Sequence, residues 1–251
     1  MRLNKKLILD GVVFFKYRGQ IPIGILLLAI PILWTNNNYN IHLSDYKFIF
    51  QIIGVFFSLT GLILRYYTIG TTPNNTSGRN RNKQIADTLN TTGSYSITRN
   101  PLYFANWLMW IGLSIFSLNY IFFLITILLF HILYERIILA EEQFLFKKFK
   151  NKYSDFCKSV PVFFPNLYNF KKAKYKCSLK KILRQEYSST LSVIWSFIFL
   201  DIIIKLIYSI KFLEKTEPLE SIYIHIFILA VSGYIALCLK IFRTYTTLLD
   251  D

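Results

Sequence analysis

The stretch SYSITRNPLYFANWLMW, residues 94–110, passes from a polar loop into an apolar segment and places Arg99, Asn100 and Pro101 at the boundary. Pro101 suits the first turn of a helix, because the backbone N–H that proline lacks would have no partner there. The N–H groups exposed at such a helix start can receive an anion. We therefore expect a helix that begins at Pro101 beside a polar site.

A second apolar segment follows after the short turn SLNY, residues 117–120. So short a connection predicts two antiparallel helices, over 101–118 and 119–140. Their other ends, residues 99–103 and 135–142, then lie close together. The sequence thus predicts a pocket with a cation at one wall and carboxylates at another.

The rest of the chain also alternates between apolar segments and polar loops. Its 251 residues are 53% hydrophobic, yet its formal charge is +15, so it is too apolar for an ordinary soluble domain and too basic for an even surface. Long apolar runs alternate with short loops, which predicts an all-α, polytopic transmembrane bundle. The six expected spans cover residues 19–35, 46–69, 101–118, 119–140, 191–210 and 221–241.

The distribution of basic residues predicts the orientation. Lysine and arginine gather before the first span, between the second and third, and after the fourth. The opposite loops, TNNNYNIHLSD and KFLEKTEPLE, are poor in positive charge or mixed with acid. The positive-inside rule then places the basic segments and both termini in the cytoplasm. The first 18 residues, MRLNKKLILDGVVFFKYR, are interpreted as a basic interfacial helix.

A dense basic run covers residues 147–184, where Asp155 is the only acid. Its lysines are Lys147, Lys148, Lys150, Lys152, Lys158, Lys171, Lys172, Lys174, Lys176, Lys180 and Lys181. We interpret the run as a solvated face that fixes topology and contacts anionic lipid headgroups. It contains no base-reading motif, so nucleic acid is not an expected partner.

The segment FHILYERIILAEEQFLFKKF carries His131, Glu135 and Glu142 at separations of four and seven residues, which places them on one helix face. Ionisable groups inside a membrane are costly, and such a stripe is expected to face the bundle interior or a polar ligand. The alternative is that Glu135 pairs locally with a basic residue. Glu141, taken alone, is interpreted as a carboxylate at the membrane interface.

The remaining reactive residues suggest little chemistry. Cys157, Cys177 and Cys238 are odd in number, so a disulfide framework is not expected, and no Cys/His spacing suggests a metal site. Asp201 and Lys205, four residues apart, are interpreted as an internal ion pair rather than as a second active site.

Four segments resemble the isoprenylcysteine carboxyl methyltransferase and phospholipid methyltransferase family. They are TSGRN at 76–80, QIADTLNTTG at 84–93, YSITRNPLYFA at 95–105 and YERIILAEEQFL at 134–145. The later FKNKYSDF and VPVFFP also look like the segment that closes the cofactor pocket in this family. The resemblance implies an integral membrane enzyme that uses S-adenosyl-L-methionine.

The family pattern is Arg-His-Pro-x-Tyr-x-small in the first helix of the hairpin and Glu-Glu-x-x-Leu in the second. The matching residues are Arg99, Pro101, Tyr103, Ala105, Glu141, Glu142 and Leu145. Asn100 stands where the family usually has histidine, and Phe156 where a tyrosine is expected. Asparagine forms hydrogen bonds but does not titrate, so cofactor binding is expected at this position and proton transfer is not.

The donor's three charged groups suggest roles for these residues. Arg99 would bind the carboxylate, Glu142 would accept from the ammonium, and Tyr103 or a neighbouring aromatic side chain would face the sulfonium. These three are the predicted catalytic residues. The predicted cofactor-binding set is Tyr95, Arg99, Asn100, Pro101, Tyr103, His131, Glu135, Glu141 and Glu142.

The resulting prediction is a multi-pass membrane methyltransferase whose site faces the cytoplasm and whose acceptor is embedded in lipid. The acceptor is an isoprenylcysteine carboxylate or a lipid phosphate oxygen, with a phospholipid amine as an alternative. The expected parts are residues 1–45 (interfacial helix and first span), 46–165 (methyltransferase core) and 166–251 (basic linker and two-span module). A sterol-reductase-like NADPH enzyme and a lipid-binding protein without activity stay open as alternatives.

Overall fold

The computed structural model describes all residues except 1–2, 36–43, 74–75, 77–83, 213–219 and 247–251. The described helices are α1 (Leu3–Tyr17), α2 (Ile21–Thr35), α3 (Ser44–Gly70), η2 (Ser94–Ser96), α4 (Pro101–Phe116), α5 (Tyr120–Phe149), α6 (Asn151–Ser159), η3 (Leu167–Asn169), α7 (Leu179–Phe212) and α8 (Glu220–Tyr245). The described residues form helices and no β-strand, so the all-α prediction is confirmed. Most of the 76–80 motif and the basic residues at 79–83 lie outside the described residues.

Helices occur over all six predicted spans, but fewer of them are long enough to cross a membrane. Four are: Tyr46–Gly70, Tyr120–Phe149, Leu179–Lys211 and Ile222–Tyr245. The pair α1 and α2 would make a fifth span with a bend of 85°. At 16 residues, α4 is about 24 Å long, short of a hydrocarbon core of about 30 Å. The described residues therefore support four or five spans by length and composition, and the prediction of six is not confirmed.

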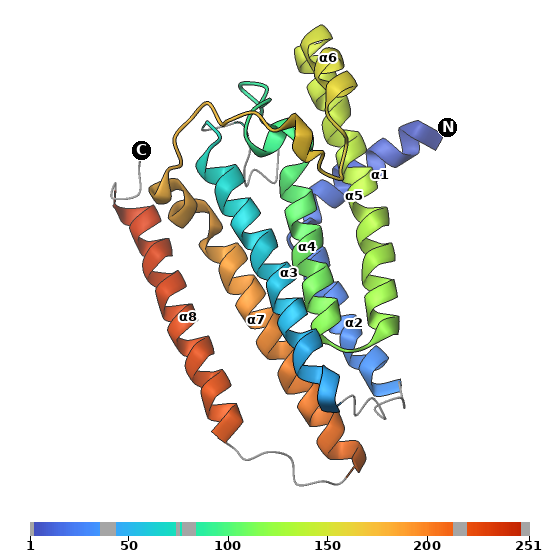
Figure 1. The fold of residues 1–251 in the computed structure, drawn as a ribbon, viewed down its shortest axis with the longest axis vertical. Helices are drawn as coiled ribbons and strands as arrows, with labels where there is room; N and C mark the ends of the chain where they lie inside the picture. Colours follow the sequence, from blue (N-terminus) through green and yellow to red (C-terminus); the bar gives the residue numbers. More distant parts are fainter. Residues whose placement is uncertain (1–2, 36–43, 74–75, 77–83, 213–219, 247–251) are drawn as a thin grey trace.

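Two helices extend well beyond the predicted spans. α5 continues past residue 140 to Phe149, and α7 begins at Leu179, before the predicted start at residue 191. The added turns are rich in charged residues, which a hydropathy pattern assigns to loops although they are compatible with a helix. These polar turns lie at the end of the bundle where α6 and the connection to α7 are found (Figure 1). They supply much of the candidate site.

Small residues bring α3 and α4 close together. A Cβ at Gly54 would lie 2.5 Å from Gly112 O, so neither helix can carry a side chain at this crossing. Ser58 Oγ, one turn further on, donates to Met109 O at 2.8 Å. Glycine and serine at such spacing allow close approach of helices where the hydrophobic effect does not drive association. This contact fixes α4, and hence Pro101, against α3.

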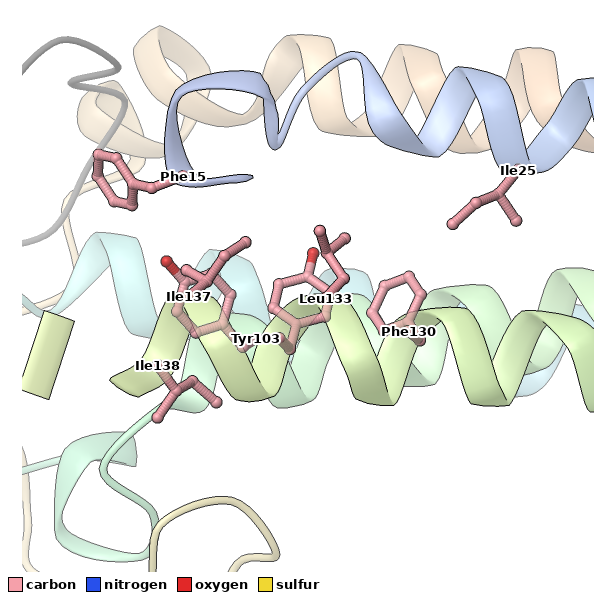
Figure 2. Packing of buried hydrophobic residues seen from close by; sticks show 8 residues of the cluster. Phe15, Ile25, Tyr103, Phe130, Leu133, Ile137 and Ile138 are labelled. Carbon is pink, nitrogen blue, oxygen red and sulfur yellow. The ribbon is translucent and has the colours of Figure 1, made fainter. Parts of the chain in front are cut away.

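α5 packs on α1 and α2 through a cluster of buried side chains. Phe15 and Ile25 lie opposite Phe130, Leu133 and Ile137 of α5 (Figure 2). Tyr103 of α4 joins the same cluster, and its ring centroid lies 4.8 Å from that of Tyr134. The amino-terminal helices thus form one wall beside the predicted hairpin.

α7 lies next to α3, and α8 packs along α7 (Figure 1). Lys205 Nζ lies 2.9 Å from Asp201 Oδ2, which confirms the predicted ion pair. His225 Nε2 of α8 lies 2.9 Å from the same oxygen, and Trp195 Nε1 donates to Ser232 Oγ at 3.1 Å. Polar contacts therefore connect the two carboxyl-terminal helices.

Candidate functional site

The boundary at residues 97–100 is fixed by the segment that follows α6. Arg99 N donates to Pro161 O at 2.9 Å, and Asn166 N donates to Ile97 O at 2.9 Å. Thr98 Oγ1 adds a hydrogen bond of 2.8 Å to Phe163 O. The VPVFFP segment is therefore attached along the entry to α4, as expected for a segment that closes a pocket.

Asn100 takes part in the same attachment. It is the residue before α4, and its side chain makes no capping hydrogen bond to that helix. Instead, Asn100 Nδ2 donates to Val162 O at 2.9 Å. An asparagine at this position can thus hold the closing segment without titrating.

Arg99 and Glu142 face one another beside this attachment. Arg99 Nη1 lies 3.3 Å from Glu142 Oε1, and the two side chains are 11% and 25% exposed. Arg99 Nη1 also donates to Cys157 Sγ of α6. Arg99 Nε, Glu142 Oε1 and the Tyr153 hydroxyl are buried without a hydrogen-bond partner among the described residues. Such atoms are costly to bury, which suggests that a polar ligand satisfies them.

Tyr153 lies on α6, outside the candidate spans. Burial raises the pKa of its phenol well above the ordinary value, and the negative charge of Glu142 and the neighbouring Cys157 raise it further, while Arg99 opposes them. The hydroxyl therefore stays protonated at neutral pH. It is available as a hydrogen-bond donor to a carboxylate or to a ligand oxygen.

A cavity of about 890 Å³ opens between the helices at this end of the bundle. Its walls come from α1, α2, α3, α4, α5, α6, α7 and α8 and from the loop at 84–90. The predicted residues that line it are Tyr95, Arg99, Asn100, Pro101, Tyr103 and Glu141. Its size is in the range of sites for small molecules and cofactors.

Glu141 lines the cavity, and its partner comes from the amino-terminal region. Arg18 Nη1 lies 3.8 Å from Glu141 Oε1, and the guanidinium carbon of Arg18 lies 3.9 Å from the centroid of the Phe15 ring. The interpretation of Glu141 as a carboxylate at the membrane interface stays a prediction, and the structure adds its pairing with Arg18 at the cavity wall. The sequence could not reveal it, because the bend between α1 and α2 brings Arg18 to this position.

The predicted stripe on α5 is divided in the structure. His131 and Glu135 are exposed and do not line the cavity, so the expectation that they face the bundle interior is wrong. The inward face of α5 carries Phe130, Leu133 and Ile137 instead. Helical spacing places Glu142 on the same face as His131 and Glu135. Only the last turns of α5, which carry Glu142, are covered by α6 and Arg99. The face of α5 that is covered by other elements therefore changes along the helix.

A buried polar network was missed by the sequence interpretation. Arg65 Nε and Nη2 donate to Glu186 of α7 at 2.7 and 2.9 Å, and Arg65 Nη1 donates to Asn106 Oδ1 at 2.6 Å. Asn106 Nδ2 in turn donates to the Tyr134 hydroxyl at 3.0 Å. All four side chains line the cavity. An arginine within an apolar span is the signal that could have found this network.

Comparison with known proteins finds a family match that covers part of this site. The model of the phospholipid methyltransferase family matches residues 49–152 of the chain. The matched region begins within α3 and ends within α6. The family is one of membrane methyltransferases and includes the isoprenylcysteine type. The match confirms the predicted resemblance over this part of the chain.

Two curated proteins are similar to part of the chain. The nickel-cobalt-cadmium resistance protein NccN of Alcaligenes xylosoxydans xylosoxydans is 34% identical over 81 residues, which are 32% of this chain and 38% of that protein. The cobalt-zinc-cadmium resistance protein CzcN of Cupriavidus metallidurans is 34% identical over 91 residues, 36% of this chain and 39% of that protein. The chain thus matches less than two fifths of the length of these relatives. No solved structure matches it.

Proposed function

We propose that this protein is an S-adenosylmethionine-dependent methyltransferase of the membrane that methylates a lipid-embedded acceptor. The family of the methyltransferase core supports the reaction class. The observation that carries the proposal is a set of buried polar atoms that have no hydrogen-bond partner among the described residues, on Arg99, Glu142 and Tyr153; Arg99 and Tyr153 line the cavity. These atoms offer donors for a carboxylate and an acceptor for an ammonium.

The donor's amino-acid end fits this arrangement. Arg99 Nε would donate to a carboxylate, and Glu142 Oε1 would accept from an ammonium, so each atom would gain the hydrogen bond that it lacks among the described residues. Tyr103, which lines the same cavity, would present its ring to a sulfonium. When bound, the donor supplies an electrophilic methyl group. The protein's residues bind it, orient it and exclude water.

The proposed acceptor is an isoprenylcysteine carboxylate or a lipid phosphate oxygen. Methyl transfer to either oxyanion requires positioning and desolvation rather than removal of a proton. A cavity lined by several arginines suits such an acceptor. A phospholipid amine would first need to be neutral, and the described site contains no histidine that could take its proton.

The topology of the proposed enzyme follows from its charges. The basic run from 147 to 184 spans the end of α5, α6 and the start of α7 at one end of the bundle (Figure 1), and the cavity-lining residues Tyr153 and Arg184 belong to it. By the positive-inside rule this end would face the cytoplasm, where the soluble donor is made. The exposed lysines of the run would contact anionic lipid headgroups.

The deciding experiment is transfer of a labelled methyl group. Membranes that contain the chain are incubated with S-adenosylmethionine labelled in its methyl group, and lipids and proteins are separated. Label in a membrane lipid or a lipidated protein supports the proposal and identifies the acceptor class. If no label is transferred and the purified chain binds NADPH instead of S-adenosylhomocysteine, the reductase alternative is correct.

The names of the two relatives suggest a setting for this activity. We propose that the methylated product acts in resistance to cobalt and cadmium, because both NccN and CzcN are named for resistance to these metals. Among the described residues no group of three or more metal-ligating side chains occurs, so the chain's contribution is assigned to methylation rather than to metal binding. Growth of expressing cells in cobalt or cadmium, with an Arg99→Ala chain as comparison, tests this role.

A further inference from the structure

The connection between α6 and α7 carries apolar side chains on its surface. We name residues 162–170 of this connection the apolar loop. Its exposed apolar side chains are Val162, Phe164, Leu167, Tyr168 and Phe170. Leu167 and Tyr168 are 72% and 100% exposed, and none of the five side chains lines the cavity. So many exposed apolar side chains on one short segment indicate contact with a membrane or with another molecule.

Hydrogen bonds hold the backbone of the apolar loop in place. Asn166 Oδ1 accepts from Tyr168 N at 3.2 Å, which turns the chain through η3. Asn169 Nδ2 donates to Ser159 O, at the end of α6, at 2.8 Å. The loop therefore presents its apolar side chains from a fixed backbone. Binding through them would not have to order the chain first.

Aromatic contacts place the loop at the level where the apolar span of α4 begins. The ring centroid of Phe163 lies 5.7 Å from that of Phe104, and the centroid of Phe164 lies 5.5 Å from that of Trp107. Since α4 starts at Pro101, both contacts lie within its first two turns. Aromatic side chains gather at the border between the headgroups and the hydrocarbon of a bilayer. The loop thus lies at the height of a membrane interface.

The charge beside the loop indicates the kind of surface that covers it. The exposed lysines that follow it are Lys171, Lys172, Lys174 and Lys176. No acidic residue occurs between residues 156 and 185. Apolar side chains next to lysines are typical of segments that bind anionic membranes, where both kinds of side chain contribute to binding. An uncharged apolar partner would leave the lysines unused.

We propose that the apolar loop binds an anionic lipid surface, with Phe164, Leu167 and Tyr168 between the headgroups and the following lysines on the lipid phosphates. The occupant of this surface is the bilayer in which the helices lie. The contact is local to the loop and separate from the cavity.

The membrane contact would also act on the donor site. The apolar loop continues the VPVFFP segment, in which Pro161 O accepts from Arg99 N at 2.9 Å and Val162 O accepts from Asn100 Nδ2 at 2.9 Å. A loop held on the membrane would keep this segment against the entry to α4. Donor binding would then be tighter on an anionic bilayer. This coupling rests on the proposed function, whereas the membrane contact does not.

The first experiment locates the loop. The full chain is reconstituted in nanodiscs of phosphatidylcholine mixed with phosphatidylglycerol, with photoreactive benzoylphenylalanine in place of Tyr168 or, as the control, Asp155. Asp155 is also exposed, but it lies on α6, which extends beyond the end of the bundle (Figure 1). We expect at least tenfold more lipid adduct at position 168, with phosphatidylglycerol enriched over its share of the disc. Adducts with a second copy of the chain, or no lipid adduct at 168, overturn the membrane contact.

The second experiment measures the coupling. S-adenosylhomocysteine is titrated onto the chain in discs with and without phosphatidylglycerol. Leu167→Ser/Tyr168→Ser removes two apolar side chains of the loop, and Tyr175→Ser/Leu179→Ser makes the same replacements at exposed positions further along the basic run. We expect at least fivefold tighter binding by the original chain on the anionic discs. The loop variant should lose this difference, and the control variant should keep it within twofold.

The two experiments separate the parts of the proposal. Lipid adducts at position 168 together with equal S-adenosylhomocysteine binding on both kinds of disc overturn the coupling. Equal losses in the loop variant and the control variant overturn it too, because the effect would then be general to the basic run. If the unsubstituted chain binds no S-adenosylhomocysteine on either disc, the proposed function is refuted, while the adducts at 168 still decide the membrane contact.

Discussion

Removing the charge of Glu142 should weaken donor binding far more than removing a similar charge elsewhere on α5. Glu142→Gln keeps the size of the side chain but leaves Arg99 without a carboxylate at 3.3 Å. It also removes the charged acceptor that the donor's ammonium would use. Arg99→Met makes the complementary change.

The structure gives the size of the expected effect. Two unit charges 3.3 Å apart interact by about 5 kcal/mol at an effective dielectric constant of 20. Water reaches the Glu142 side chain, which is 25% exposed, and a charged hydrogen bond in such a place contributes about 2–3 kcal/mol. Each variant should therefore bind S-adenosylhomocysteine about 30- to 150-fold more weakly.

The assay is calorimetric titration of detergent-purified variants with S-adenosylhomocysteine, with folding checked by thermal melting. Glu135→Gln is the matched control, because it makes the same change two turns earlier on the same helix at an exposed position. It should bind within twofold of the original chain. The double variant Arg99→Met/Glu142→Gln should lose less than the sum of the two single changes, since the residues act together.

If both single variants bind S-adenosylhomocysteine about as tightly as the unsubstituted protein, this reasoning is refuted. Residues 99–103 would then be only a helix start with a buried arginine, and the assignment of the donor site would have to be abandoned. Equal losses in Glu142→Gln and Glu135→Gln would refute it as well, because the cause would then be general to α5.

Further expectations follow from the packing, the buried network and the charges. Gly112→Ala should lower the free energy of unfolding by about 1–3 kcal/mol because its Cβ would meet α3, whereas Gly24→Ala, which meets nothing within 4 Å, should not destabilise in thermal melts. Arg65→Met leaves Glu186 buried without its ion partner and should cost about 3–5 kcal/mol, much of which Arg65→Met/Glu186→Leu should recover. The raised pKa of Tyr153 predicts that this residue leaves the stability unchanged below about pH 10 and lowers it at higher pH, because the phenol ionises first in the unfolded chain. Tyr153→Phe should therefore reduce the loss of thermal stability at alkaline pH, and an unchanged loss would contradict this prediction. Dual reporters fused after residues 117 and 170 should be external and cytoplasmic, respectively, and a reversed result would contradict the proposed orientation.

Several features of the fold follow from local sequence. Pro101 starts α4, and the short turn before Tyr120 forces an antiparallel partner, with Asn119 accepting a hydrogen bond from Phe122 N at 2.8 Å. These signals act within a few residues, so they can be recognised without knowing the rest of the molecule. The Asp201–Lys205 pair is equally local, because four residues bring two side chains together on any helix.

The sequence also determined that Arg99 and Glu142 lie together, because a tight hairpin aligns the far ends of its helices. It did not determine that Glu141 pairs with Arg18 or that His131 lies outside the bundle. Helical spacing states which residues share a face, but only the neighbours of that face decide whether it is buried. For α5 those neighbours are α1, α2 and α6, which the chain brings in from both sides of the hairpin.

Only the tertiary structure shows that the carboxyl-terminal helices contribute side chains to the cavity wall. Arg65 and Glu186 are 121 positions apart, yet they share two hydrogen bonds at the cavity wall. An arginine in an apolar span indicates that some partner exists, since an unpaired charge there is costly. Which carboxylate supplies that partner depends on where α7 packs against α3, and that is set by the summed contacts of both helices rather than by any local pattern.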